Sequence, residues 1–258
     1  MTTHIYPRIG ILGGMGPLAT ADFLAKLTHA TPALCDQDHF PVTVESAPQI
    51  PDRIAALEGR GDDPLPALLA VARRLTGAGC DLIAMPCNTA HLWYDALRAQ
   101  TGAPILHIAD AVATELKDAC TVDLMGTVGL MGTTGTLSSG LYQRRIGGAV
   151  QWLLPDAAAM TAHVMPGVAA VKRGEMSAAA ALLRPVVLDL AARGADVIVL
   201  GCTEIPLAIS AADAPVPVID ATAALARATV AAALRLRAAA GGVASDTRAA
   251  TAAVRKAA

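Results

Sequence analysis

The chain has 258 residues, of which 54% are hydrophobic and only 3% aromatic, and its net charge is −2. This length suits one large domain or two smaller ones with an aliphatic core. The balanced charge, without a basic run, argues against nucleic acid as a partner. No apolar stretch approaches the ~20 residues of a membrane span, so we expect no membrane partner.

The N-terminus runs directly into a predicted strand and lacks the charged start and apolar stretch of a signal peptide, which predicts a cytoplasmic protein. Five scattered cysteines, an odd number, suit reduced thiols better than a disulfide framework. The chain has no Cys-x-x-Cys or His-Glu-x-x-His pattern, so we predict no metal site.

The first predicted strand, 9–12, leads into the loop Gly13-Gly-Met-Gly16 and then a helix. Residues 14–19 satisfy the dinucleotide pattern G-x-G-x-x-A, with Asp36 and Asp38 as candidate ribose ligands, but these acids precede the next strand when they should end it. An alternative is that backbone N–H groups of the loop hold a small anion such as a carboxylate. A plain tight connection is the third option.

A proline-punctuated loop, residues 46–53, follows the second strand and carries Arg53, whose planar fork suits a carboxylate, although a solvated arginine is the commoner case. A helix over 64–76 leads to a strand over 82–85. The remaining predicted elements are a helix from Asn88 or Thr89, a strand over 104–110, helices over 111–119 and 141–148, a strand over 150–154, an amphipathic stretch over 164–174, a helix over 177–193, strands over 197–200 and 216–220, a helix over 221–237, and a loose tail or fraying helix from 238.

Two stretches of the sequence occur twice at nearly the same offset. Residues 77–91 (GAGCDLIAMPCNTAH) overlay 192–206 (ARGADVIVLGCTEIP), and residues 9–18 overlay 128–137. Chance similarity between two strand-turn-helix segments is the alternative to a duplication. We predict an α/β fold with two pseudo-symmetric parallel-sheet α/β domains, the active site lying in the cleft between them. The first domain comprises 1–111 plus 219–258 and the second 112–218.

Each repeat ends in a cysteine directly after a buried strand, Cys87 in one and Cys202 in the other. The carboxyl ends of parallel strands are where ligands bind in such sheets. Two thiols on opposite sides of one ligand suit proton removal from one face of a carbon and proton delivery to the other, which inverts a stereocentre. A helix after Cys87 would lower the pKa of its thiol.

The alternatives for these residues are structural. Buried cysteines are often small hydrophobes, which is the interpretation for Cys35, Cys80 and Cys120. His91 lies one helical turn from Cys87, so a Cys-His pair is an option, while a packed histidine is the commoner one.

The motifs IGILGGMGP, PCNTAH, the Thr-x-x-Thr loop and GCTEIPL resemble the aspartate/glutamate racemase family, in particular its aspartate racemase branch, over roughly residues 9–220. The resemblance implies a cofactor-independent, two-base racemase of an acidic amino acid, commonly a homodimer, with Cys87 and Cys202 as the acid/base pair. It implies substrate binding by Met15 (backbone), Asn88, Thr89, Thr133, Thr136, Thr203 and Glu204, and selection of an acidic side chain by Arg53 and Lys172.

Two departures from the family's pattern leave side-chain specificity open. Ile54 stands where many relatives have Thr, and Gly132 where Ala is frequent. Competing functions are a hydantoin racemase, a maleate isomerase, an arylmalonate decarboxylase, a non-catalytic amino-acid-binding protein and a cysteine hydrolase. The sequence does not distinguish the natural substrate, the physiological direction or the state of assembly.

Overall fold

A computed structural model describes residues 6–102, 104–119, 126–148 and 150–256, with side chains outside 118–119 and 241–256. The first half comprises β1 (Ile9–Gly13), α1 (Pro17–Ala30), β2 (Val42–Ser46), α2 (Arg53–Leu57), α3 (Leu65–Gly77), β3 (Leu82–Ala84), α4 (Tyr94–Thr101), β4 (Ile105–Leu106) and α5 (Ile108–Ala119). The second comprises β5 (Thr127–Met131), α6 (Thr134–Ser138), α7 (Leu141–Ile146), β6 (Gln151–Leu153), α8 (Ala157–Ala159), α9 (Met165–Lys172), α10 (Met176–Ala192), β7 (Val197–Leu200), β8 (Val218–Asp220) and α11 (Ala221–Lys256). Single 3-10 turns η1 (Asp36–Asp38), η2 (Thr89–Trp93), η4 (Ile205–Leu207) and η5 (Ala211–Asp213) and the π-turn η3 (Met160–Val164) connect them.

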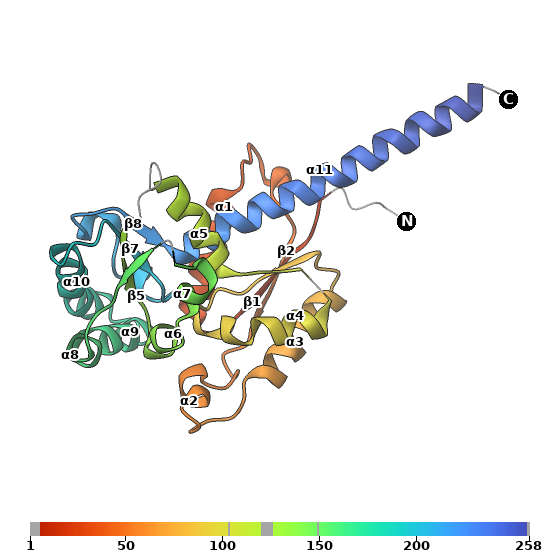
Figure 1. The fold of residues 1–258 in the computed structure, drawn as a ribbon. Coiled ribbons are helices and arrows are strands. Elements are labelled where there is room, and N and C mark those ends of the chain that lie inside the picture. Colours follow the sequence, from red (N-terminus) through yellow and green to blue (C-terminus); the bar gives the residue numbers. More distant parts are fainter. Residues whose placement is uncertain (1–5, 103, 120–125, 149, 257–258) are drawn as a thin grey trace.

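The strands form two four-stranded sheets in which every pair is parallel, with the orders β2-β1-β3-β4 and β6-β5-β7-β8. The two sheets lie side by side with helices around them (Figure 1). Each order places the first strand of its half beside the strand that precedes a cysteine loop. The predicted α/β class, with two similar parallel sheets, is confirmed.

Each sheet has a point where the chain reverses its direction of winding. The chain passes from β1 to its neighbour β2 and then crosses to β3 on the other side of β1, and β5, β6 and β7 repeat this path. Loops diverge at such a point, so a crevice opens at the carboxyl ends of the two central strands. The glycine loop after β1 and the cysteine loop after β3 therefore meet at one crevice, as do their counterparts after β5 and β7.

Gly10 and Gly129 occupy equivalent positions in the two halves, and at both positions a neighbouring element packs closely against the backbone. A Cβ on Gly10 would lie 3.2 Å from both Cβ and Sγ of Cys80, and a Cβ on Gly129 would lie 3.2 Å from Cβ of Ala195. The turn before each cysteine strand therefore packs directly on the neighbouring strand. Cys80 is 8% exposed in this contact, which supports its structural interpretation.

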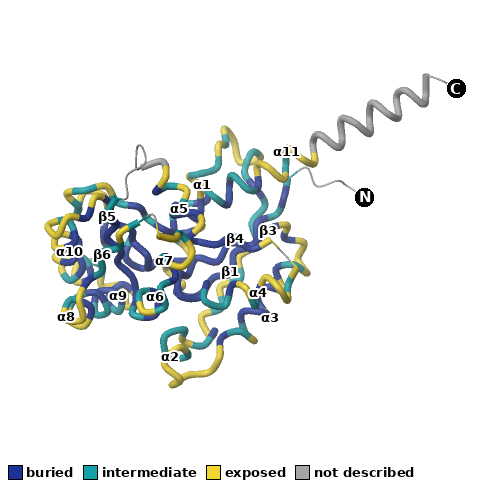
Figure 2. Tube along the Cα trace, viewed as in Figure 1, coloured by how far each residue is buried: buried dark blue, intermediate teal, exposed yellow. Residues whose placement is uncertain are grey.

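The largest group of buried side chains is shared by the two halves. It combines residues of β1 and β3 with residues of β5 and β7 and with one face of α5 and α11. Figure 2 shows the strands as the buried part of the molecule and the helices half-exposed around them. α11 packs on α1 and α5, so the last helix contacts the first half. The domain boundaries themselves stay a prediction.

Three predicted elements differ from the structure. β4 has two residues and α5 already begins at Ile108, because Nδ1 of His107 accepts the Ala109 N–H (3.1 Å) and starts the helix early. The helix expected over 141–148 is separate from α6, since Gly140 has a φ of 62°, in the left-handed region. α11 continues to Lys256, beyond the expected end near Arg237. Cys35 is exposed, so the interpretation of this residue as a buried small hydrophobe is wrong. Cys120 lies outside the described residues.

Candidate active site

The two predicted cysteines lie at equivalent strand ends. Cys87 follows β3 and Cys202 follows β7, and they are buried, with 6% and 4% of their surfaces exposed. Both line one small pocket, whose walls are loops that follow strands of both sheets. Two sulfurs thus lie on a single cavity, the arrangement that a shared ligand demands.

Every residue predicted for the substrate site lines the same pocket. The nine residues around the two cysteines are Met15, Arg53, Asn88, Thr89, Thr133, Thr136, Lys172, Thr203 and Glu204. Asp52 and Ile54 also line it, although the sequence analysis gave neither a binding role. In the sequence, the one feature that could have indicated these two residues is their position on either side of Arg53.

Three threonine hydroxyls join the two halves across the pocket. Oγ1 of Thr89 lies 3.0 Å from Oγ1 of Thr133 and 3.0 Å from Oγ1 of Thr136, and the latter two are 3.2 Å apart. Thr133 also caps α6, accepting the Thr136 N–H (3.3 Å). A ring of three hydroxyls can turn its hydrogens toward an acceptor in the pocket, because each hydroxyl both donates and accepts.

Glu204 connects the second cysteine loop to the glycine loop of the other half. Its Oε2 accepts hydrogen bonds from Sγ of Cys202 (3.1 Å) and Oγ1 of Thr203 (3.3 Å), and its Oε1 accepts the Gly16 N–H (3.1 Å). The Gly14 N–H is taken by Oγ1 of Thr20 (2.8 Å). The carboxylate that this glycine loop binds is therefore one of the protein's own.

Burial raises the pKa of both catalytic candidates. For Cys87, desolvation is the largest cause, opposed by the positive charges of Arg53 and Lys172. For Cys202, the pKa is raised well above its ordinary range by desolvation and then by the charge of Glu204. The expectation that a helix terminus lowers the pKa of Cys87 overall is wrong, because loss of solvent outweighs the local backbone contribution.

The cationic side of the pocket is built around α2. Nη1 of Arg53 donates to the carbonyls of Ile50 (3.0 Å) and Pro51 (2.9 Å), which fixes the guanidinium at the pocket wall. Oδ1 of Asp52 caps the helix by accepting the Ala55 N–H at 2.8 Å. Lys172, the last residue of α9, also lines the pocket. Arg53 and Lys172 therefore both bring positive charge to the pocket, close to the carboxylate of Asp52.

Comparison with known proteins identifies the family. The model of the Asp/Glu/Hydantoin racemase family matches residues 12–229, which include both cysteine loops and both glycine loops. The chain belongs to the Asp/Glu/hydantoin racemase family. The resemblance seen in the sequence is confirmed, and with it the prediction that the chain is an enzyme of the racemase class.

Individual relatives of this racemase cover nearly the whole chain. The broad specificity amino-acid racemase RacX of Bacillus subtilis is 28% identical over 86% of this chain and 96% of its own length. The solved aspartate racemase of Picrophilus torridus is 34% identical, covers 88% of this chain and 94% of its own, and superposes with a TM-score of 0.78. An aspartate racemase homologue from Pyrococcus horikoshii is 25% identical, with 88% and 98% coverage and a TM-score of 0.64.

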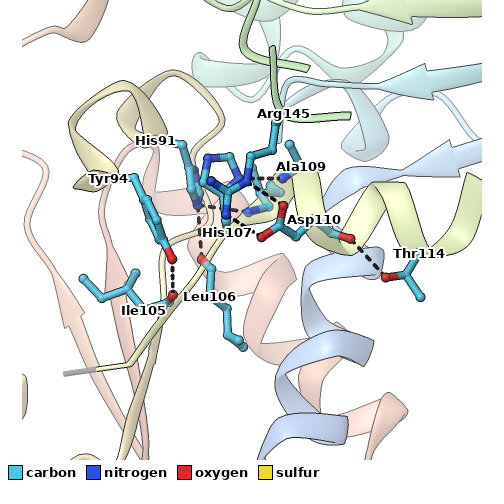
Figure 3. A network of polar contacts seen from close by, with 10 residues as sticks. His91, Tyr94, Ile105, Leu106, His107, Ala109, Asp110, Thr114 and Arg145 are labelled. Atoms are coloured by element: carbon cyan, nitrogen blue, oxygen red, sulfur yellow. Dashed lines mark hydrogen bonds and ion pairs between the residues drawn. The ribbon is translucent and has the colours of Figure 1, made fainter. Parts of the chain in front are cut away.

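In this racemase, His91 supports the first cysteine loop from outside the pocket. Its Nδ1 lies 2.8 Å from the carbonyl oxygen of Cys87, and its Nε2 accepts the Ile108 N–H (3.1 Å). The same Nε2 lies 3.3 Å from the carbonyl oxygen of Leu106 (Figure 3). Burial lowers the pKa of His91 to about 4, which keeps the ring neutral, as the first two of these contacts require. Both nitrogens are occupied, so the interpretation as a packed histidine holds and the Cys-His pair is wrong.

The ring of His91 belongs to a cluster that ties the helices together. The ring centroids of His91 and His107 are 4.7 Å apart, and those of His107 and Tyr94 are also 4.7 Å apart. Arg145 of α7 forms a two-pronged ion pair with Asp110 of α5 (2.6 and 2.7 Å), beside these rings (Figure 3). The cluster therefore joins α4, α5 and α7 behind the cysteine loop.

Among the described residues, no group of three or more His, Cys, Asp or Glu side chains is placed to hold a metal ion. Within the same part of the chain, no helix combines the length and hydropathy that crossing a bilayer requires.

Proposed function

We propose that the protein is a cofactor-independent racemase of aspartate or another acidic amino acid, with Cys87 and Cys202 as the two bases. The observation that carries the proposal is that both cysteines line one pocket together with nine polar or charged residues from both halves, Asp52 included. One thiolate removes the hydrogen of Cα as a proton, the opposite thiol delivers its own proton to the other face, and the roles are exchanged for the reverse reaction.

The surroundings of the two sulfurs favour a resting arrangement. The Glu204 carboxylate accepts a hydrogen bond from Cys202, so the proton is held on that sulfur. Arg53 and Lys172 lower the pKa of Cys87 against the effect of burial, and the ammonium group of an incoming amino acid would act in the same direction. We therefore assign Cys87 as the base and Cys202 as the acid in the free enzyme to which the substrate binds.

The acidic side chain is proposed from the charges in the pocket. Arg53 and Lys172 both line the cavity, and a guanidinium and an ammonium there suit a distal carboxylate. Two relatives carry names that fit this choice, the aspartate racemase of Picrophilus torridus and the broader RacX of Bacillus subtilis. The second name makes a wider range of amino acids the alternative.

The test is circular dichroism of L-aspartate incubated with the protein in the presence of a chelator. The signal should decay to zero as the racemate forms, and Cys87→Ala and Cys202→Ala should each reduce the rate to background, because a two-base reaction loses its donor or its acceptor. Cys35→Ala, which changes an exposed cysteine, is the matched control and should leave the rate unchanged. Substantial turnover by either active-site variant would remove the two-base mechanism.

Three competing functions make different predictions. A hydantoin racemase or a maleate isomerase would be silent on amino acids but active on its own substrate in the same assay. A binding protein without turnover would leave the Cα hydrogen of aspartate in place in deuterium oxide, whereas the racemase exchanges it. The homodimer and the cytoplasmic location remain predictions, and light scattering would give twice the chain mass of 26.2 kDa for a dimer.

A further inference from the structure

Asn88 carries an unused hydrogen-bond donor in the wall of the pocket. Its side chain is 3% exposed, and its Nδ2 has no hydrogen-bond partner among the described residues. Its Oδ1, in contrast, accepts the hydroxyl of Tyr142 at 2.5 Å. A buried polar group without a partner has lost its hydrogen bonds to water and gained none in return. A ligand that accepts a hydrogen bond from Nδ2 would replace one of these lost bonds.

Tyr142 determines the orientation of the side-chain amide of Asn88. Its phenol is fully buried, and burial raises its pKa, so the oxygen keeps its hydrogen and must donate it. Oδ1 of Asn88 is the one acceptor found for it in the described part of the chain. If the amide were turned over, its NH2 group would face the phenol and the phenol hydrogen would have no acceptor.

The ring of Tyr142 has little freedom to move. A Cβ on Gly201, the residue before Cys202, would lie 3.1 Å from Cε2 of the ring, so the ring packs directly on the backbone there. Its other neighbour is Trp152, with the two ring centroids 6.0 Å apart. The hydroxyl is therefore held in place from the second half of the chain, while the amide that it contacts belongs to the first half.

We infer that Tyr142 is a positioning residue that holds the NH2 group of Asn88 toward the ligand and so makes Asn88 a donor to the substrate's α-carboxylate. The inference rests on the proposed function. The carboxylate is the acceptor closest to the reacting carbon, and Asn88 directly follows Cys87. When the α-proton leaves, negative charge spreads into that carboxylate, so a fixed donor binds the transition state more strongly than the substrate.

The kinetic test replaces Tyr142 with Phe, which removes the hydroxyl and keeps the ring. Tyr142→Phe should lower kcat/KM for aspartate by about 10- to 100-fold, mostly through kcat, since the Asn88 amide is no longer held to donate to the charged carboxylate. In an Asn88→Ala background the same change should cost nothing further. Tyr94→Phe is the matched control: Tyr94 is also buried and donates to a backbone carbonyl, that of Ile105 (3.1 Å). Additive losses in the double variant would overturn the inference.

A second readout does not depend on turnover. Asn88 is the sole asparagine among the 258 residues, so protein labelled with ¹⁵N in the asparagine side chain gives one NH2 signal. L-aspartate at saturation should move at least one of its protons downfield in the wild type and in Tyr94→Phe. In Tyr142→Phe this movement should be lost. An unmoved signal in the wild type, or an equal movement in Tyr142→Phe, would refute the positioning role.

The two readouts separate the inference from the proposed function. A wild type that racemises aspartate, with Tyr142→Phe matching it in both assays, would leave the function standing and remove the role of Tyr142. A wild type that racemises no amino acid but shows the ligand-induced movement, lost in Tyr142→Phe, would do the reverse.

Discussion

Acidification to pH 5 should destabilise the protein through two buried histidines. Burial lowers the pKa of His91 to about 4 and that of His107 to about 3, against an ordinary value of 6.5 in the unfolded chain. The unfolded state therefore takes up protons first as the pH falls. The stabilisation from His91 is complete above pH 6.5 and is lost as the pH falls from there toward 4.

The size of the effect follows from these values. Between pH 6.5 and pH 5 the folded ring stays neutral while the unfolded one is protonated, and each pH unit costs about 1.36 kcal/mol, so His91 alone lowers the free energy of unfolding by about 2 kcal/mol. His107 acts in the same direction. Carboxyl groups do not obscure this window, because their unfolded pKa values of about 4 lie below it.

The measurement is urea unfolding followed by tryptophan fluorescence at pH 7, 6 and 5. His91→Gln should reduce the loss between pH 7 and pH 5 by about 2 kcal/mol relative to the wild type. His29→Gln, at an exposed position, is the control and should keep the wild-type dependence. A wild-type free energy of unfolding that is flat over this range, or an unchanged dependence in His91→Gln, would refute the reasoning.

Three other outcomes are expected. Glu204→Gln should lower the pKa of Cys202, because a negative charge 3.1 Å from its sulfur is removed, and Cys202 should then react faster with iodoacetamide at pH 8 by mass spectrometry; an unchanged or slower rate contradicts this. Lys172→Ala should lower kcat/KM for aspartate by about tenfold or more and leave kcat/KM for alanine unchanged. Equal losses for the two substrates would argue against selection by charge. Gly167→Ala should destabilise by about 1–3 kcal/mol in thermal unfolding, because its Cβ would lie 2.6 Å from Cγ of Leu183, whereas Gly77→Ala, with nothing within 4 Å, should not destabilise.

The repeated sequence was sufficient to predict that the two cysteines meet at one pocket. A buried strand followed by a cysteine is a local pattern, and parallel strands align their carboxyl ends, so Cys87 and Cys202 had to reach the same edge of their sheets. Arg53 and Lys172 were found through the family's motifs, and the fold then brought them to the pocket.

The contacts that tune the site were not readable from the sequence. Glu204 reaches Gly16 across 188 positions of sequence and Tyr142 reaches Asn88 across 54, so both pairings depend on how the two halves dock. The pKa of Cys87 was predicted in the wrong direction for a related reason. A helix terminus is a local feature, whereas desolvation depends on every loop that closes over the sulfur.

The two halves bring like thiols to the pocket, but the surroundings of these thiols are unlike. The first cysteine is followed by Asn88, whose Nδ2 is an unused donor among the described residues, and by Thr89. The second is followed by Thr203 and by Glu204, whose carboxylate accepts a hydrogen bond from the Cys202 thiol. A racemase must give either enantiomer a base and an acid, but nothing requires the free enzyme to be symmetric. Because Glu204 holds a proton on Cys202, we expect the free enzyme to bind in its reactive form the enantiomer whose α-hydrogen faces Cys87. In the proposed mechanism, each turnover in this direction leaves a proton on Cys87 and a thiolate at Cys202, so a proton must return to Cys202, and its hydrogen bond to Glu204 favours that return.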